Sequence, residues 1–185
     1  MIRPANMYAW AKNCYGCHTV PQEKLVNVGG HPAGSKFELV SWSQGEVRHN
    51  VWYNKGKDNP NAAPERRRLM FVVGQAVELE TSIRAVGAAT EKADYAVAMA
   101  KRATKAKKRF AAIGEKLSDV AEIGEINEIA ASAKLKLNNG AELGPAADKI
   151  GDAAARIAAN YDGSTFSAVD GLMPPEDKYK GTPSK

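Results

Sequence analysis

The chain has 185 residues, of which 44% are hydrophobic and 7% aromatic, and its formal charge is +5. This length supports one domain with a sizeable core, and the alanine-rich composition favours helices that pack closely through small side chains. No run of residues approaches the roughly 18 apolar positions that a membrane-spanning helix needs, so we expect no transmembrane segment. The modest positive charge suits docking to acidic proteins and argues against nucleic acid as a partner.

Both cysteines fall within residues 14–18, which read Cys-Tyr-Gly-Cys-His, the C-x-x-C-H pattern of c-type haem attachment. Two thiols on one turn can add to the two porphyrin vinyl groups, and the histidine that follows can bind the iron. A zinc site would need a second Cys/His cluster, and a thioredoxin-like pair would need a βαβ context; the sequence offers neither. We therefore expect one covalent haem c on Cys14 and Cys17, with His18 as proximal ligand and with Tyr15 and Trp10 packed on the ring edge.

The next predicted element is a helix over residues 35–53. Ser35 is a suitable N-cap with Glu38 three residues later, and apolar residues follow through Trp52. The helix is expected to end before residues 54–60, where Asn, Gly, Asp and Pro are typical of a loop.

Apolar residues then recur at helical spacing from Leu69 to Val86, after Pro64 at a suitable first helical position, and from Ala96 to Leu117 in a shifted register. The pattern predicts either two long helices or one helix with a slip near Gly87, packed as coiled-coil-like partners. Three arginines at 66–68 could pair with surface carboxylates or with haem propionates. The basic residues between Lys101 and Arg109 indicate a solvated face, with a docking patch for an acidic partner as the alternative.

Two further helices are expected. One is capped by Ser118 and stops at residues 138–140, and the other starts at Pro145 and is closed by Asp162 and Gly163. No strand-like alternation of useful length appears. The predicted fold is all-α: a haem-binding region over residues 1–60 on a bundle of long, alanine-rich helices over 61–163, with an extended or disordered tail over 164–185.

The sixth iron ligand would decide the function, because a second histidine gives a low-potential carrier, methionine raises the potential, and an open site permits ligand binding. His49 lies on the 35–53 helix, with Gly45 one turn earlier leaving room for a porphyrin. His31 lies in a glycine-rich loop close enough along the chain to pass round the haem edge. Both could also be ordinary surface histidines. Met70 is the best methionine candidate, although its place beside an apolar stripe is typical of core packing.

Three stretches together, residues 14–18, Gly30-His31-Pro32 and Phe37-Glu38-Leu39, resemble the multihaem c-type cytochromes related to the electron acceptor of hydroxylamine oxidoreductase. The similarity covers about residues 10–90, and it implies thioether attachment, proximal ligation by His18 and distal ligation by His31 or His49. Those relatives carry several C-x-x-C-H motifs, whereas this chain carries one. The surplus histidine could therefore serve a haem on a preceding segment or a neighbouring subunit.

These observations predict electron transfer by a bis-histidine c-type haem, with redox proteins and other cytochrome subunits as partners. A haem sensor with an open sixth site and a haem-bearing structural subunit stay open as alternatives, as does the oligomeric state. No enzyme active site apart from a haem is expected. Haem attachment of this type implies a periplasmic or extracellular location, although residues 1–7 lack the features of an export signal.

Overall fold

The computed structural model describes residues 5–45 and 60–181, and within these ranges it contains helices and no strands, which confirms the all-α prediction. The elements are α1 (Met7–His18), α2 (Glu23–Asn27), α3 (Leu39–Ser43), α4 (Pro64–Ala88), α5 (Asp94–Lys116), α6 (Ala121–Ser132), α7 (Gly140–Asn160) and the 3₁₀ helices η1 (Ser167–Leu172) and η2 (Glu176–Lys178). None of the described helices is both long enough and apolar enough to cross a bilayer.

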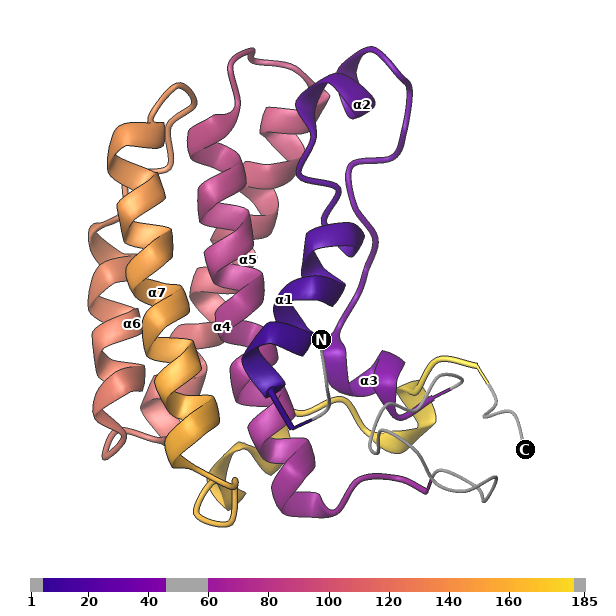
Figure 1. Cartoon of the computed structure of the whole chain (residues 1–185), viewed down its shortest axis with the longest axis vertical. Helices are drawn as coiled ribbons and strands as arrows, with labels where there is room; N and C mark the ends of the chain where they lie inside the picture. Colours follow the sequence, from indigo (N-terminus) through magenta and orange to yellow (C-terminus); the bar gives the residue numbers. More distant parts are fainter. Residues whose placement is uncertain (1–4, 46–59, 182–185) are drawn as a thin grey trace.

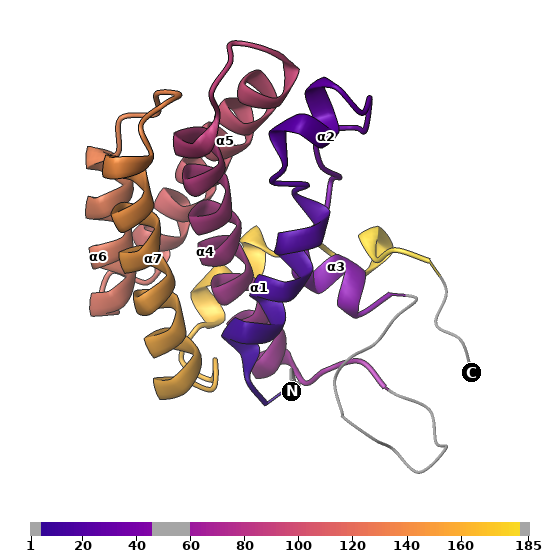
Figure 2. The ribbon, with the colours of Figure 1, turned by 45° about the horizontal axis from the view of Figure 1, so that its top comes forward.

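Helix α4 is the centre of the bundle. It packs most extensively on α7 and α5 and also contacts α1, while α6 lies on the outer side against α7 and α5. Figures 1 and 2 show α6 and α7 at one side of the molecule and α1, α2 and α3 at the other. Because neighbours surround α4, it is buried nearly all round rather than along one stripe. Side chains of all three predicted regions join one hydrophobic core.

The choice between one and two helices near Gly87 is decided in favour of two. Helix α4 begins with Pro64 in its first turn and ends at Ala88, where the extended backbone of Ala89 turns the chain toward α5. The predicted stripe of α5 faces the core, since Ala96, Met99 and Phe110 are all buried.

Three predicted boundaries in the second half of the chain are wrong. Helix α6 begins at Ala121, with Val120 as its N-cap in place of the expected Ser118. Helix α6 ends at Ser132 instead of continuing to Asn138, because residues 133–139 return to the end of α4, where the Asn138 N–H donates to the Ala89 carbonyl at 2.7 Å. Helix α7 begins at Gly140, so Pro145 lies inside it. The buried Leu143 packs against Gly87 of α4, and this burial offsets the backbone hydrogen bond that Pro145 cannot donate.

The helix predicted over residues 35–53 starts later than expected, and α3 ends at Ser43 with Gln44 as its C-cap. The first residue of α3 is Leu39, and Glu38 is its N-cap, with carboxylate oxygens that accept from the N–H groups of Val40 at 3.0 Å and Ser41 at 2.7 Å. Glu38 therefore supplies the cap that the sequence assigned to Ser35, because its longer side chain folds back onto its own helix. Residues beyond 45 of that predicted helix lie outside the described ranges.

The C-terminal segment is folded from Gly163 to the last described residues, so the prediction of an extended or disordered tail over residues 164–185 is wrong there. Phe166 and Val169 are fully buried, and the Lys180 N–H donates to the Ser41 carbonyl at 2.8 Å. The yellow segment in Figures 1 and 2 accordingly runs from the end of α7 across the bundle toward α3. Sequence hydropathy underestimated this segment, because its two buried apolar side chains act together with ion pairs from Arg67 and Arg68 of α4, which are distant in the chain.

Candidate functional site

The C-x-x-C-H motif occupies the last turn of α1. Asn6 caps the start of this helix, with its side-chain oxygen accepting from the Ala9 N–H at 3.1 Å, and His18 is its last residue. Cys17 and His18 follow Cys14 by three and four positions, which places all three side chains on one face of the helix. Cys14 is half-buried at the edge of the core, Cys17 is exposed, and both are free thiols.

The His18 imidazole is held between three side chains. It stacks on the Phe37 ring with centroids 4.2 Å apart and an interplanar angle of 10°, and the Trp42 ring lies 5.1 Å away at a tilt. Its Nδ1 atom lies 3.2 Å from the hydroxyl of Ser35. Burial lowers the pKa of His18, so the imidazole is neutral at pH 7 and Nε2 is the nitrogen left to bind a metal.

The environment of Cys14 disfavours a structural zinc site. Burial, followed by the neighbouring Cys17, raises the pKa of Cys14 to about 11. A structural zinc site uses thiolates, which this environment disfavours. Across the described ranges no group of three His, Cys, Asp or Glu side chains converges as a metal site. Two thiols and one oriented neutral imidazole on one helix face are the donor set that a c-type haem needs, so these residues fit that group.

Tyr15, which was expected at the ring edge, instead points into the bundle. It is fully buried, and its ring meets the edge of Phe37 at a centroid distance of 4.9 Å. Phe37 therefore contacts both the core residue Tyr15 and the motif residue His18. Trp10 is likewise buried in the core.

The candidate distal ligands are placed unequally. His31 lies in the loop after α2 with its ring exposed, and its Nδ1–H donates to the Pro32 carbonyl at 2.9 Å, which leaves Nε2 open to solvent. None of its described contacts is with the motif. His49 lies outside the described residues. Met70 is fully buried on α4, where its sulfur lies 3.9 Å from the Gln44 amide nitrogen, as expected for core packing.

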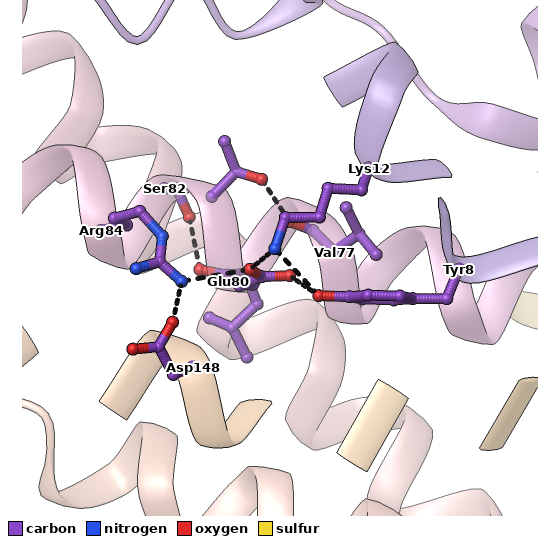
Figure 3. A network of polar contacts seen from close by, with 9 residues as sticks. Tyr8, Lys12, Val77, Glu80, Ser82, Arg84 and Asp148 are labelled. Carbon is purple, nitrogen blue, oxygen red and sulfur yellow. Dashed lines mark hydrogen bonds and ion pairs between the residues drawn. The ribbon is translucent and has the colours of Figure 1, made fainter. Parts of the chain in front are cut away.

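A buried carboxylate fixes the motif helix to the bundle. Glu80 of α4 accepts from the Tyr8 hydroxyl at 3.0 Å and pairs with Lys12 at 2.8 Å, both on α1 (Figure 3). Arg84 lies 3.2 Å from the same carboxylate and reaches Asp148 of α7 at 2.8 Å. The network therefore joins α1, which holds the C-x-x-C-H motif, to α4 and α7.

Part of the basic run on α5 does not face solvent freely. Arg102 pairs with the buried Glu78 at 3.2 Å and donates to the Ser35 carbonyl, and Arg109 lies 3.6 Å from the same carboxylate. Lys101, Lys105 and these arginines line a pocket of about 400 Å³ beside residues 33–38. Sequence reasoning missed Glu78 and Glu80, although two carboxylates that alternate with the apolar residues of α4 signal that cationic partners lie nearby.

The arginines that open α4 pair with the C-terminal segment. Arg67 donates to Glu176 at 2.6 Å and to the Tyr179 hydroxyl at 3.0 Å. Arg68 makes two bonds of 2.7 Å to the carboxylate of Asp170. The ion-pairing interpretation is therefore confirmed for these two residues, which have carboxylate partners other than haem propionates.

Comparison of the chain with protein-family models, curated proteins and solved structures found no match.

Proposed function

We propose that this protein transfers single electrons through one c-type haem attached to Cys14 and Cys17, with His18 Nε2 as the proximal iron ligand. The observation that carries the proposal is the stacked, hydrogen-bonded His18 imidazole at the end of the helix that presents both thiols. The haem would supply a one-electron iron couple. The resemblance of residues 10–90 to multihaem cytochromes supports the same function, at a periplasmic or extracellular location.

The residues around the motif have separate tasks in this proposal. Phe37 and Trp42 shield one side of the imidazole from water, and Ser35 sets its orientation. Glu80 keeps α1 against the bundle through Lys12 and Tyr8. Such a fixed surrounding suits electron transfer, because the iron ligand then moves little between the two oxidation states.

The decisive experiment is expression in a periplasm that contains the haem-attachment machinery, followed by intact-protein mass and a pyridine haemochrome spectrum. We expect the mass of one added haem, a thioether-type spectrum and no free thiol. Cys14→Ser and Cys17→Ser should each lose one thioether bond, whereas Ser132→Ala on the outer helix α6 should load normally. A wild-type mass without haem would refute the proposal.

The sixth ligand is proposed to be His31 or His49, which would give a bis-histidine, low-potential iron. The exposed ring of His31, with Nε2 uncommitted, leaves that nitrogen able to bind iron in this chain or in a neighbouring cytochrome subunit. His31→Ala and His49→Ala should be compared by absorption spectrum and by size in solution. If only one variant loses the low-spin spectrum and assembly is unchanged in both, the other histidine does not bind a haem of a neighbouring subunit.

Carbon monoxide binding to the ferrous protein distinguishes electron transfer from the sensor alternative. A bis-histidine iron should bind carbon monoxide slowly or not at all, whereas rapid binding would indicate a sensor with an open site. A structural haem subunit should associate into larger complexes at working concentration.

For the redox partner we propose an acidic protein surface. Lys101 and Lys105 are exposed on α5 and line the same pocket as Ser35, which contacts His18. Electron-transfer rates with such a partner should fall as salt is added, because exposed charges are screened within about 10 Å at 0.1 M salt. A rate independent of salt would exclude this docking surface.

A further inference from the structure

Ser35 makes three hydrogen-bonding contacts with His18. The Ser35 N–H donates to the His18 carbonyl at 2.8 Å, the Ser35 hydroxyl lies 3.4 Å from the same carbonyl, and the hydroxyl oxygen lies 3.2 Å from His18 Nδ1. These contacts join two segments that are 17 residues apart, so Ser35 moves with the motif. The role first expected of this residue, capping a helix, is performed by Glu38.

The hydroxyl has one proton, and its two possible acceptors are the His18 carbonyl and Nδ1. When the proton points to the carbonyl, a lone pair of the oxygen faces Nδ1, and Nδ1 must then carry a hydrogen and donate it. That arrangement leaves Nε2 without a proton, which is the tautomer that can bind iron. A hydrogen bond from Nδ1–H also makes a ligating imidazole a stronger electron donor.

A buried ion pair fixes Ser35 from the other side. Arg102 donates to the Ser35 carbonyl and to Glu78 at 3.2 Å, and the two paired side chains are only 13% and 8% exposed. Gly34 has φ +80°, and a Cβ there would lie 2.9 Å from the Arg102 guanidinium and 3.2 Å from the His18 carbonyl oxygen. The loop is thus held between α5 and the end of α1 with little space to shift.

We propose that Ser35 is a positioning residue that fixes the tautomer and orientation of His18 and lowers the reduction potential of the iron bound to it, with the Arg102–Glu78 pair holding Ser35 in place. This inference rests on the proposed haem function. It adds to that function a means by which the protein sets the potential of its proximal ligand, through contacts between residues as far apart in the chain as 35 and 102.

The test is the midpoint potential of the haem-loaded wild type and of Ser35→Ala. Loss of one net hydrogen bond, about 1 kcal/mol, corresponds to about a fivefold change in the one-electron equilibrium constant. At 59 mV per tenfold change this is a rise of about 40 mV. The Nδ1 proton of His18, followed by NMR, should also exchange faster with solvent.

Two further variants make the result specific. Ser35→Thr retains the hydroxyl and should keep the wild-type potential and exchange rate. Ser132→Ala removes a hydroxyl that donates to the Ile129 carbonyl at 2.9 Å on an exposed helix turn, and it should change neither quantity. Arg102→Lys keeps the positive charge but loses the planar fork that reaches both acceptors, so we expect a smaller rise than in Ser35→Ala.

The outcomes are separable. A wild type without covalent haem would refute the proposed function itself. A haem-loaded Ser35→Ala protein with wild-type potential and wild-type Nδ1–H exchange would overturn the inference and leave the function standing. If Ser35→Ala does not load haem, Arg102→Lys decides, and an unchanged potential there overturns the inference. A shift in Ser35→Ala with none in Arg102→Lys would overturn the part assigned to the ion pair.

Discussion

The ammonium group of Lys12, which lies two residues before the first cysteine of the motif, is 2.8 Å from the Glu80 carboxylate. The Lys12 side chain is 50% exposed, whereas that of Glu80 is 1% exposed, so the cation reaches inward from the surface to a buried anion. Burial by itself would lower the pKa of Lys12, but its bonds with Glu80 and Tyr8 outweigh this and raise it. The pair couples the position of α1, and with it the C-x-x-C-H motif, to the centre of α4.

Replacing Glu80 with glutamine should destabilise the protein by about 3 kcal/mol, because it leaves Lys12 and Arg84 without the carboxylate that both contact. Urea unfolding at pH 7 measures the change. Glu128→Gln, on the exposed face of α6, is the matched control and should stay within about 0.5 kcal/mol of wild type. Equal stabilities of the two variants would show that the network contributes nothing measurable.

Phe37→Ala should cost about 3 kcal/mol, since it removes a buried ring that contacts both His18 and Tyr15 and leaves a cavity between them. In haem-loaded protein the same change should broaden the absorption spectrum as the imidazole loses its support. Leu25→Ala, at a side chain that is 40% exposed, is the control for loss of apolar volume. A cost as small as that of the control would contradict a supporting role for Phe37.

The docking of η1 on α4 should depend on pH through Asp170. The bonds from Arg68 hold the pKa of this carboxyl below its usual value, so its contribution to stability is present above about pH 4 and is lost as the pH falls through the lowered value. The protection factor of the Val169 amide, which is the intrinsic exchange rate relative to the rate measured by NMR at the same pH, should therefore fall on acidification below pH 4. Asp170→Asn should show fast exchange already at pH 7. If protection of the Val169 amide in the wild type does not change over this pH range, the contribution assigned to Asp170 is contradicted.

Gly163→Ala should cost about 2 kcal/mol or more, because this residue has φ +88° and a Cβ there would lie 2.0 Å from the Glu65 carbonyl oxygen. Gly124→Ala provides an opposite control: nothing lies within 4 Å of its Cβ position, and alanine favours a helix by about 0.5 to 1 kcal/mol. Thermal unfolding should thus move in opposite directions for the two variants. A neutral Gly163→Ala would contradict the close approach of the C-terminal segment to α4.

Features that depend on a few neighbouring residues could be predicted. The start of α4 at Pro64 and the apolar stripe of α5 follow from ring geometry and helical periodicity, both of which act within one or two turns. Boundaries that distant contacts decide were predicted wrongly. The early end of α6 depends on hydrogen bonds to the end of α4, and the folded C-terminal segment depends on Arg67 and Arg68, about 100 residues earlier in the chain.

The sequence by itself determined that two thiols and an imidazole lie within five consecutive residues at C-x-x-C-H spacing, and that the chain offers no second Cys/His cluster for a zinc site. Only the tertiary structure decided what surrounds His18. Ser35, Phe37 and Trp42 reach it across a loop, and Arg102 and Glu78 hold that loop from two other helices. Such contacts cannot be read from local pattern, since their geometry exists only once the helices pack and exclude water.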